Sequence, residues 1–102
     1  MPKFFTKWKM NQSTCPATPE ERAKVYQSLL AMVKADMNAG RITDWGVFAG
    51  GNEGYSISEL SEADLFTAQL KYDPYVIFEV SPVLSTDQVM ESMMKAAAAA
   101  QK

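Results

Sequence analysis

Hydrophobic residues follow two different periods along the chain, and the strand-like period recurs four times. Runs rich in aromatic and β-branched residues occupy residues 3–10, 41–49, 54–60 and 75–83. Such runs are typical of β-strands. In the first run, Phe4, Thr6, Trp8 and Met10 share one face, which is suited to burial. The last run is nearly continuous in Val, Ile and Phe, so we expect it at an interior position of a sheet.

The helical period appears between these runs, and each helix has a recognisable start. Thr18-Pro19-Glu20-Glu21 combines a capping threonine, a proline at the first helical position and a capping-box glutamate. Gly40 stands where a left-handed C-terminal cap is expected. Ser61 and Ser85 open two further helices in the same way. The last helix enters the alanine run 96–100, which has little to bury, and we expect this run to fray.

A glycine-rich reversal joins the second and third strand-like runs. Gly50-Gly51-Asn52-Glu53-Gly54 contains residues that tolerate positive φ angles, as a tight hairpin turn requires. The predicted element order is therefore β-α-β-β-α-β followed by α. This is the ferredoxin-like α+β pattern, a four-stranded antiparallel sheet with two helices on one face and here an additional C-terminal helix. We expect residues 1–102 to form this single domain.

The other face of such a sheet is exposed or is covered by a second chain. The last predicted strand has apolar residues on both faces, with Val76, Phe78 and Val80 on one and Tyr75, Ile77 and Val83 on the other. In so small a domain, this pattern indicates self-association. We therefore expect a homodimer or a higher homo-oligomer, packed sheet to sheet as in a dimeric α/β barrel, with the C-terminal helix assisting.

Composition narrows the range of functions. The chain has 102 residues, a net charge of −2, no histidine and one cysteine, Cys15. The absence of basic runs argues against nucleic-acid binding. Without histidine or clustered acids and cysteines, no metal site is predicted, and we expect no cofactor. A lone cysteine fits a reducing cytoplasm. Because the sequence contains no long apolar run, we expect neither a signal peptide nor a membrane span.

Two stretches of the second half resemble muconolactone isomerase. They are residues 54–60 (GYSISEL) and 73–80 (DPYVIFEV). That family belongs to the dimeric α/β-barrel superfamily, in which two ferredoxin-like sheets pack into a barrel. The chain also resembles a group of small uncharacterised microbial domains of that superfamily, which share the GGxxGY hairpin (residues 50–55) and the stretch FEVxPVLS (residues 78–85). This second resemblance implies the fold and the dimer but no activity.

The chain departs from the isomerase where chemistry is concerned. Muconolactone isomerase has a His-Pro segment after its last strand, and Ser85-Thr86-Asp87 stands here instead. Isomerisation next to a carbonyl needs a placed base and a placed acid. No matched residues supply them, so the resemblance does not extend to the isomerase activity.

Three residues are candidates for acid–base chemistry. Glu59 and Glu79 are candidate bases, with Tyr55 as a partner, because a carboxylate in a partly apolar cleft has a raised pKa. The alternative is structural: these glutamates pair with Lys7 or Lys9 across the sheet or across a dimer. Arg41 and Asp44 are likewise expected to form a surface ion pair.

Aromatic residues are candidates for lining a pocket between the sheet and the helices, which is the usual location for a small ligand. The candidates are Trp8, Trp45, Phe48, Tyr55, Tyr72 and Tyr75. The alternative is that these side chains form an ordinary hydrophobic core.

Three hypotheses on function follow. The first is a domain of dimeric α/β-barrel type that binds a small apolar or aromatic ligand in the cleft between sheet and helices. The second is an enzyme of the muconolactone-isomerase or cofactor-independent monooxygenase type. The third is a structural oligomerisation module. A cavity of several hundred Å³ holding an unpaired carboxylate favours the enzyme, and a solid core favours the module.

Overall fold

Strands and helices alternate in the order that the hydrophobic pattern predicts. The computed structural model describes residues 2–100. Within them, the elements are β1 (Lys3–Met10), α1 (Pro19–Asn38), β2 (Asp44–Val47), β3 (Glu53–Ser58), α2 (Glu62–Leu70), β4 (Val76–Val83) and α3 (Thr86–Ala100). The predicted α+β class is confirmed, and the order βαββαβα is that of a ferredoxin-like fold with a C-terminal helix.

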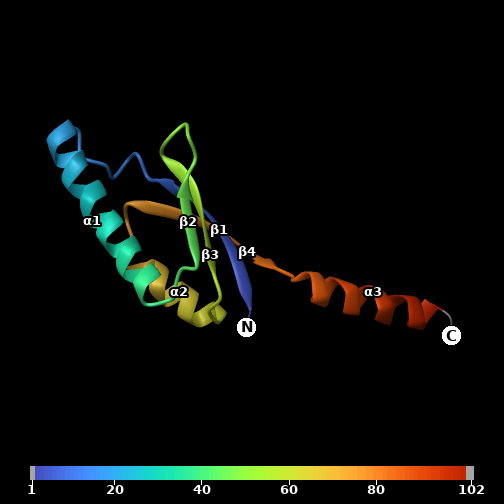
Figure 1. Cartoon of the computed structure of the whole chain (residues 1–102). Coiled ribbons are helices and arrows are strands. Elements are labelled where there is room, and N and C mark those ends of the chain that lie inside the picture. Colours follow the sequence, from blue (N-terminus) through green and yellow to red (C-terminus); the bar gives the residue numbers. More distant parts are fainter. Residues whose placement is uncertain (1, 101–102) are drawn as a thin grey trace.

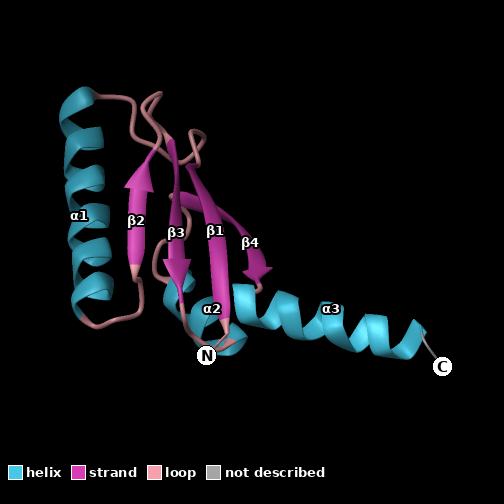
Figure 2. Ribbon diagram, turned by 45° about the vertical axis from the view of Figure 1, so that its right-hand side comes forward, coloured by secondary structure: helices cyan, strands magenta, loops and turns pink. Residues whose placement is uncertain are grey.

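The four strands form one antiparallel sheet in the order β2-β3-β1-β4 (Figure 2). The helices α1 and α2 lie on one side of this sheet (Figure 1). The prediction that the last strand is interior is wrong, because within residues 2–100 β4 pairs with β1 alone and forms an edge. A continuous apolar run indicates that both faces of a strand need cover, and it does not indicate that both edges are paired. Ile77 and Val83 on the open face of β4 are 42% and 37% exposed in the single chain.

The two sheet faces divide the residues of β1 and β3 as alternation requires. Phe4, Thr6 and Trp8 are buried beneath the helices, and the residues between them are exposed. The register pairs Phe4 with Ser58 and Thr6 with Ser56, so both serines lie on the same covered face. The core beneath α1 centres on Leu29, Val33 and Tyr72 and includes Met10, Ile42, Trp45, Val76 and Phe78.

The predicted helix ends are confirmed. The Thr18 hydroxyl accepts a hydrogen bond from the Glu21 amide at 3.3 Å, and Gly40 follows α1 with a φ of +79°. The Ser61 hydroxyl caps α2 by accepting from the Asp64 amide at 3.2 Å. At α3 the Gln88 amide donates to the Ser85 hydroxyl, and the Ser85 amide donates to the Gln88 side chain. Capping therefore defines all three starts in the way that the sequence indicates.

The hairpin strands are shorter than predicted. β2 covers Asp44–Val47, within the predicted range 41–49, and β3 begins at Glu53 and ends at Ser58. The turn uses positive φ angles at Gly51 (+78°) and Asn52 (+66°). The missing residues at the start of β2 belong to the connection from α1, where the amides of residues 41 and 42 donate to the Asp36 carbonyl oxygen at 2.9 and 3.3 Å. These amides are therefore not available to a strand ladder.

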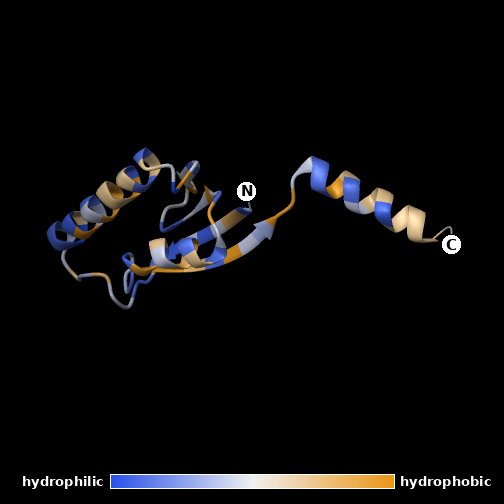
Figure 3. Cartoon of the chain, turned by 90° about the horizontal axis from the view of Figure 1, so that it is seen from below, coloured by the Kyte–Doolittle hydropathy of each residue, from blue (hydrophilic) through white to orange (hydrophobic). Residues whose placement is uncertain are grey.

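The helix α3 projects away from the rest of the domain (Figures 1 and 3). None of its residues is buried, and Val89, Met90, Met93 and Met94 expose apolar side chains. Its alanine run is helical through Ala100, whereas we expected fraying, because alanine has the highest intrinsic helix propensity. No helix among residues 2–100 has the length and hydrophobicity needed to cross a bilayer.

Candidate functional site

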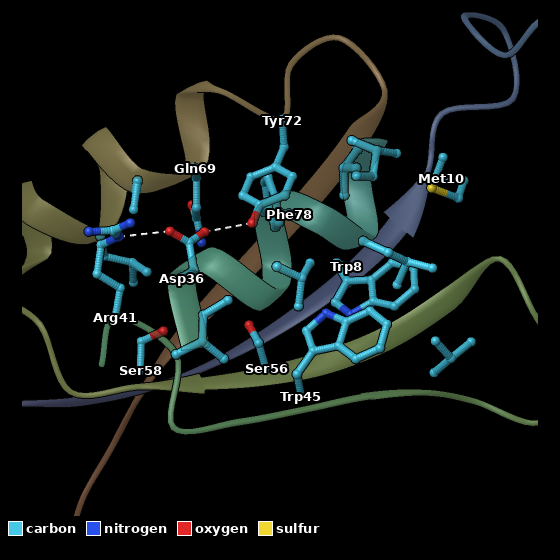
Figure 4. A pocket seen from close by; sticks show the side chains of 18 of the residues that line it. Trp8, Met10, Asp36, Arg41, Trp45, Ser56, Ser58, Gln69, Tyr72 and Phe78 are labelled. Carbon is cyan, nitrogen blue, oxygen red and sulfur yellow. Dashed lines mark hydrogen bonds and ion pairs between the residues drawn. The ribbon is translucent and has the colours of Figure 1, made fainter. Parts of the chain in front are cut away.

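A cavity of about 240 Å³ lies between the covered sheet face and the two helices α1 and α2 (Figure 4). Its walls come from all four strands of the sheet on one side and from α1 and α2 on the other. Leu30 of α1 and Val47 of β2 border the cavity and are 46% and 51% exposed. The cavity therefore opens to solvent between α1 and the β2 edge of the sheet.

A stacked pair of indoles forms one end of the cavity. The rings of Trp8 and Trp45 lie 5.5 Å apart between centroids and are parallel to within 6°. The Trp8 indole N–H donates to the Tyr55 carbonyl oxygen at 3.3 Å. Gly54 lies opposite Trp8 in the register, and a Cβ there would overlap both the Trp8 indole and the Gly46 carbonyl oxygen. The glycine of the hairpin therefore allows the indole to lie flat across β3.

A row of small polar side chains crosses the floor of the cavity. Ser56 and Ser58 are 7% and 2% exposed and point from β3 into the cavity (Figure 4). Among the described residues, no side-chain hydrogen bond joins either hydroxyl to another group, and no fully buried side-chain N or O atom lacks a partner, so both hydroxyls have access to the cavity. Their neighbour Thr6 accepts a hydrogen bond from the Gln69 amide at 3.5 Å. The floor thus holds two hydroxyls that are ready to bond a ligand.

The other end of the cavity is built around a buried carboxylate, and we call the four residues involved the Asp36 cluster. The side chain of Asp36 is 1% exposed. Its Oδ1 accepts from the Arg41 Nε at 2.7 Å and from the Lys71 Nζ at 2.5 Å. Its Oδ2 accepts from the Tyr72 hydroxyl at 2.6 Å. These bonds join the end of α1 to the following loop and to the end of α2.

The cluster keeps Asp36 ionised. Burial raises the pKa of Asp36, but the hydrogen bonds from Lys71, Tyr72 and Arg41 together outweigh it and leave this pKa below the usual value. Burial, followed by the hydrogen bond to Asp36, raises the pKa of Tyr72 above its usual value. At neutral pH the cluster therefore consists of one anion, two cations and a neutral phenol. It carries one positive charge in excess.

Both Asp36 oxygens are occupied, which limits the chemistry of this carboxylate. A general base must be able to take a proton from a substrate, and that requires a free oxygen and a pKa near the working pH. Asp36 has three donors and a lowered pKa. Its role is therefore to hold the two helix ends together and to orient Arg41 beside the cavity.

The predicted aromatic residues lie on both faces of the sheet. Trp8, Trp45 and Tyr72 line the cavity. Tyr75 packs against the core under α1 without lining the cavity. Phe48 and Tyr55 stack on each other, with centroids 6.5 Å apart, on the face opposite the helices. We call this opposite face the outer face.

The predicted acid–base residues are not brought together at the cavity. Tyr55 lies on the outer face, where its hydroxyl donates to Asp44 Oδ2 at 3.0 Å and this bond raises the pKa of Tyr55. Glu79 is also on the outer face, opposite Lys7 in the register. Glu59 is exposed and follows β3. The predicted Arg41–Asp44 ion pair does not form, because Arg41 bonds to Asp36 instead.

The Asp36 cluster was not predicted, although the sequence carries a signal for it. Asp36 lies seven residues after Leu29 and three after Val33, on the stripe of α1 that faces the core. An acid at such a position needs a buried partner. Arg41 is five residues after Asp36, so it could be recognised as a local partner. Lys71 and Tyr72 follow α2, and the spacing of residues near Asp36 does not indicate that they contact it.

Comparison with known proteins identifies a family. Residues 2–97 match the model of a family described as "Domain of unknown function (DUF3303)". The chain belongs to the DUF3303 family. The DUF3303 match covers the whole sheet, the helices α1 and α2, and α3 as far as Ala97. None of the curated proteins compared with the chain matches it.

Proposed function

We propose that this DUF3303 domain binds a small apolar or aromatic ligand in the cavity between the sheet and the helices. The observation that carries the proposal is an open, largely apolar cavity with the Trp8–Trp45 pair at one end and unpartnered hydroxyls on its floor. Small-molecule sites are concave and apolar and have a few polar groups that fix orientation. A solid core, as a purely structural module would have, leaves no such space.

The size of the cavity sets the size of the ligand. A protein cavity of about 150 Å³ holds a benzene molecule. The cavity here has about 240 Å³, which corresponds to one ring with one or two small substituents. A flat ring stacked on an indole also gains from the offset-stacked geometry that aromatic pairs prefer.

Intrinsic fluorescence tests this proposal directly. The chain contains two tryptophans, and both line the cavity. We expect small aromatic acids and lactones to change the emission in a saturable way and to raise the melting temperature with increasing concentration. The absence of both responses at millimolar concentrations would count against ligand binding.

A matched pair of variants locates the response. Ala68 lines the cavity from α2, and Ala63 is exposed on the same helix. Ala68→Phe puts a ring into the cavity, whereas Ala63→Phe adds the same ring on the surface. We expect Ala68→Phe to abolish the response and Ala63→Phe to keep it. Equal responses from both variants would place the binding elsewhere.

The enzymatic alternative has less support from this geometry. It assigns acid–base roles to Glu59 or Glu79 with Tyr55, and Glu79 and Tyr55 lie on the outer face, away from the cavity. Asp36, the acid at the cavity, has no free oxygen. Ligand binding without chemistry is therefore the function that the site supports best.

We also propose that two copies pack through the outer face, as in a dimeric α/β barrel. This face carries the apolar side chains of Phe5, Ile57, Ile77 and Val83. It also carries three lysines and three acids, Lys3, Lys7, Lys9, Asp44, Glu53 and Glu79, so a second copy meets no net repulsion. The exposed apolar residues of α3 extend the surface that a partner can cover.

Light scattering at micromolar concentration tests this arrangement. Ile77→Glu puts a charge on the outer face, and we expect it to produce a monomer. Phe66→Glu makes the same kind of change at a residue of α2 that is 65% exposed, on the helical side of the sheet, and we expect it to stay dimeric. A monomeric wild-type protein would contradict the proposal. If Phe66→Glu dissociates the dimer and Ile77→Glu does not, the interface is on the helical side of the sheet and not on the outer face.

A further inference from the structure

We propose that the ligand is a small aromatic carboxylate whose anionic group binds beside Arg41 and Ser58 while its ring lies on Trp8 and Trp45. This inference rests on the proposed ligand-binding function and specifies the chemistry of the ligand. It starts from the uneven distribution of polar groups along the cavity. The polar groups gather at the Asp36 end, and the indoles occupy the other end (Figure 4).

The sheet register supports this division of the cavity. Ser58 lies opposite Phe4 near the start of β1, whereas Gly54 lies opposite Trp8 near its end. The connection from α1 meets β3 at the Ser58 end, because the Thr43 amide donates to the Ile57 carbonyl oxygen at 2.8 Å. Arg41 is therefore held close to Ser58. An elongated ligand lying along β3 places one end at the indoles and the other at Arg41.

The charge at the polar end selects an anion. A cationic ligand would have to compete with Arg41, Lys71 and Tyr72, whose three hydrogen bonds already take most of the acceptor capacity of the Asp36 carboxylate. The cluster has one positive charge in excess, and Arg41 bonds to Asp36 through Nε alone. The two terminal nitrogens of its guanidinium have no bond to any group in the described part of the chain. A carboxylate is the group that matches such a planar donor pair.

The hydroxyl of Ser58 completes the anion site. Its residue is 2% exposed and lines the cavity, and the hydroxyl makes no side-chain hydrogen bond to another group among residues 2–100. Because no fully buried side-chain N or O atom among residues 2–100 lacks a partner, this hydroxyl has access to the open cavity, where a ligand carboxylate can accept its hydrogen bond in place of water. Ser56 offers a second donor between Ser58 and the indoles.

Matched pairs of compounds separate this inference from the proposed function. Benzoate, phenylacetate and 4-methylbenzoate are titrated into the intact protein at pH 7, alongside their primary amides, with tryptophan fluorescence as the readout. The amides have the same shape without the charge. We expect the carboxylates to bind at least about 10-fold more tightly, because hydrogen bonds to an ionised group are the stronger ones.

Two variants with the same charge change identify the residue responsible. Arg41→Gln and Lys71→Gln each remove one cation and one hydrogen bond to Asp36, but Arg41 lines the cavity and Lys71 does not. We expect Arg41→Gln to lose about 10-fold in benzoate affinity and to leave benzamide unchanged. Lys71→Gln keeps the benzoate affinity within about threefold, as expected of a partly exposed charge that does not line the cavity. Ser58→Ala, which leaves the cluster intact, weakens benzoate binding severalfold.

Each other outcome refutes a defined part of the reasoning. If the amides bind as tightly as the acids, the ligand is not a carboxylate, and the proposed binding function stands. If Arg41→Gln and Lys71→Gln lose the same affinity, the general charge of the cluster attracts the ligand and Arg41 does not contact it. If no compound binds, the proposed function itself fails.

Discussion

The substitution Asp36→Asn tests the structural role of the Asp36 cluster. It keeps the shape of the side chain and removes the charge to which Arg41, Lys71 and Tyr72 all donate. Hydrogen bonds to charged groups contribute about 1.5–3 kcal/mol each when they are buried. The Arg41 and Lys71 side chains are 43% and 36% exposed, so water can replace part of each hydrogen bond that they lose. We therefore assign a loss of about 1 kcal/mol of stability to each of these two bonds.

The Tyr72 hydroxyl adds to this cost because it is buried. Tyr72 is 6% exposed, and a buried donor that loses its ionised acceptor costs about 1 kcal/mol or more. The sum is about 3 kcal/mol, which agrees with the roughly 3–5 kcal/mol found when buried ion pairs are broken. For a domain of this size, it corresponds to a fall in melting temperature of about 12–24 °C.

Urea unfolding followed by tryptophan fluorescence measures the effect, and Asp44→Asn is the control. Asp44 is exposed and accepts from Tyr55 at 3.0 Å, so its loss should cost less than about 1 kcal/mol. The pH dependence provides a second check. The folded pKa of Asp36 is below the usual value of 3.8, so its contribution is present above that pH and is lost as the pH falls below it.

The difference between wild type and Asp36→Asn should therefore shrink below about pH 4, where protonation removes the same charge from the wild-type protein. A loss of less than about 1 kcal/mol at neutral pH, or a loss equal to that of Asp44→Asn, would refute the reasoning. So would a difference that stays constant down to pH 2.

Three further predictions are tested in the same unfolding assay, one of them with a matched control. Gly54→Ala should cost about 2 kcal/mol or more, because its Cβ overlaps the Gly46 carbonyl oxygen and the Trp8 indole, whereas Gly50→Ala, with open space around it, should be nearly neutral. Tyr72→Phe should cost about 1–3 kcal/mol at pH 7. Because the pKa of Tyr72 is raised in the folded protein, its hydroxyl contributes stability below pH 10.0, and this contribution is lost as the pH rises above that value. Above pH 10.0, the Tyr72→Phe variant should therefore lose less stability than the wild type. Ser56→Val should add about 1 kcal/mol by replacing an unpartnered hydroxyl with apolar volume, at the expense of ligand affinity.

The elements that the sequence predicted correctly are those with local signals. Thr18, Ser61 and Ser85 cap their helices through contacts within four residues, and Asn52 and Gly51 adopt the positive φ angles of a hairpin turn. Alternation in residues 3–10 likewise gave the correct buried face. Each of these features depends on the conformational preferences of a few neighbouring residues.

Features that depend on long-range contacts were predicted poorly. β4 is an edge strand because β1 lies between β3 and β4 in the sheet. The composition of β4 indicates that both of its faces are apolar, but it carries no information on how many strands pair with it. Arg41 bonds to Asp36 instead of Asp44, because the loop after α1 turns its side chain toward the helix end. The cavity requires residues from six elements at once, and Ser56 and Ser58 become informative only when their position in the cavity is seen.

The site was therefore predicted in part. The sequence indicated a pocket between sheet and helices and named Trp8, Trp45 and Tyr72, which line it. It also named Tyr55 and Phe48, which alternation and the register put on the outer face. Side chains alternate between the two faces of a strand, so a shift of one residue moves a side chain to the opposite face. Which hairpin residues face the helices could not be assigned before the strand register was known.

The most direct test of the account is a titration of the isotope-labelled protein with benzoate, followed by two-dimensional NMR. The indole N–H groups of Trp8 and Trp45 and the backbone amide of Ser58 report the two ends of the cavity. We predict saturable shifts of all three signals, with the side-chain methyl signals of Ile77 on the outer face unmoved. Saturable shifts confined to the outer face, or no shifts at millimolar benzoate, would contradict the account.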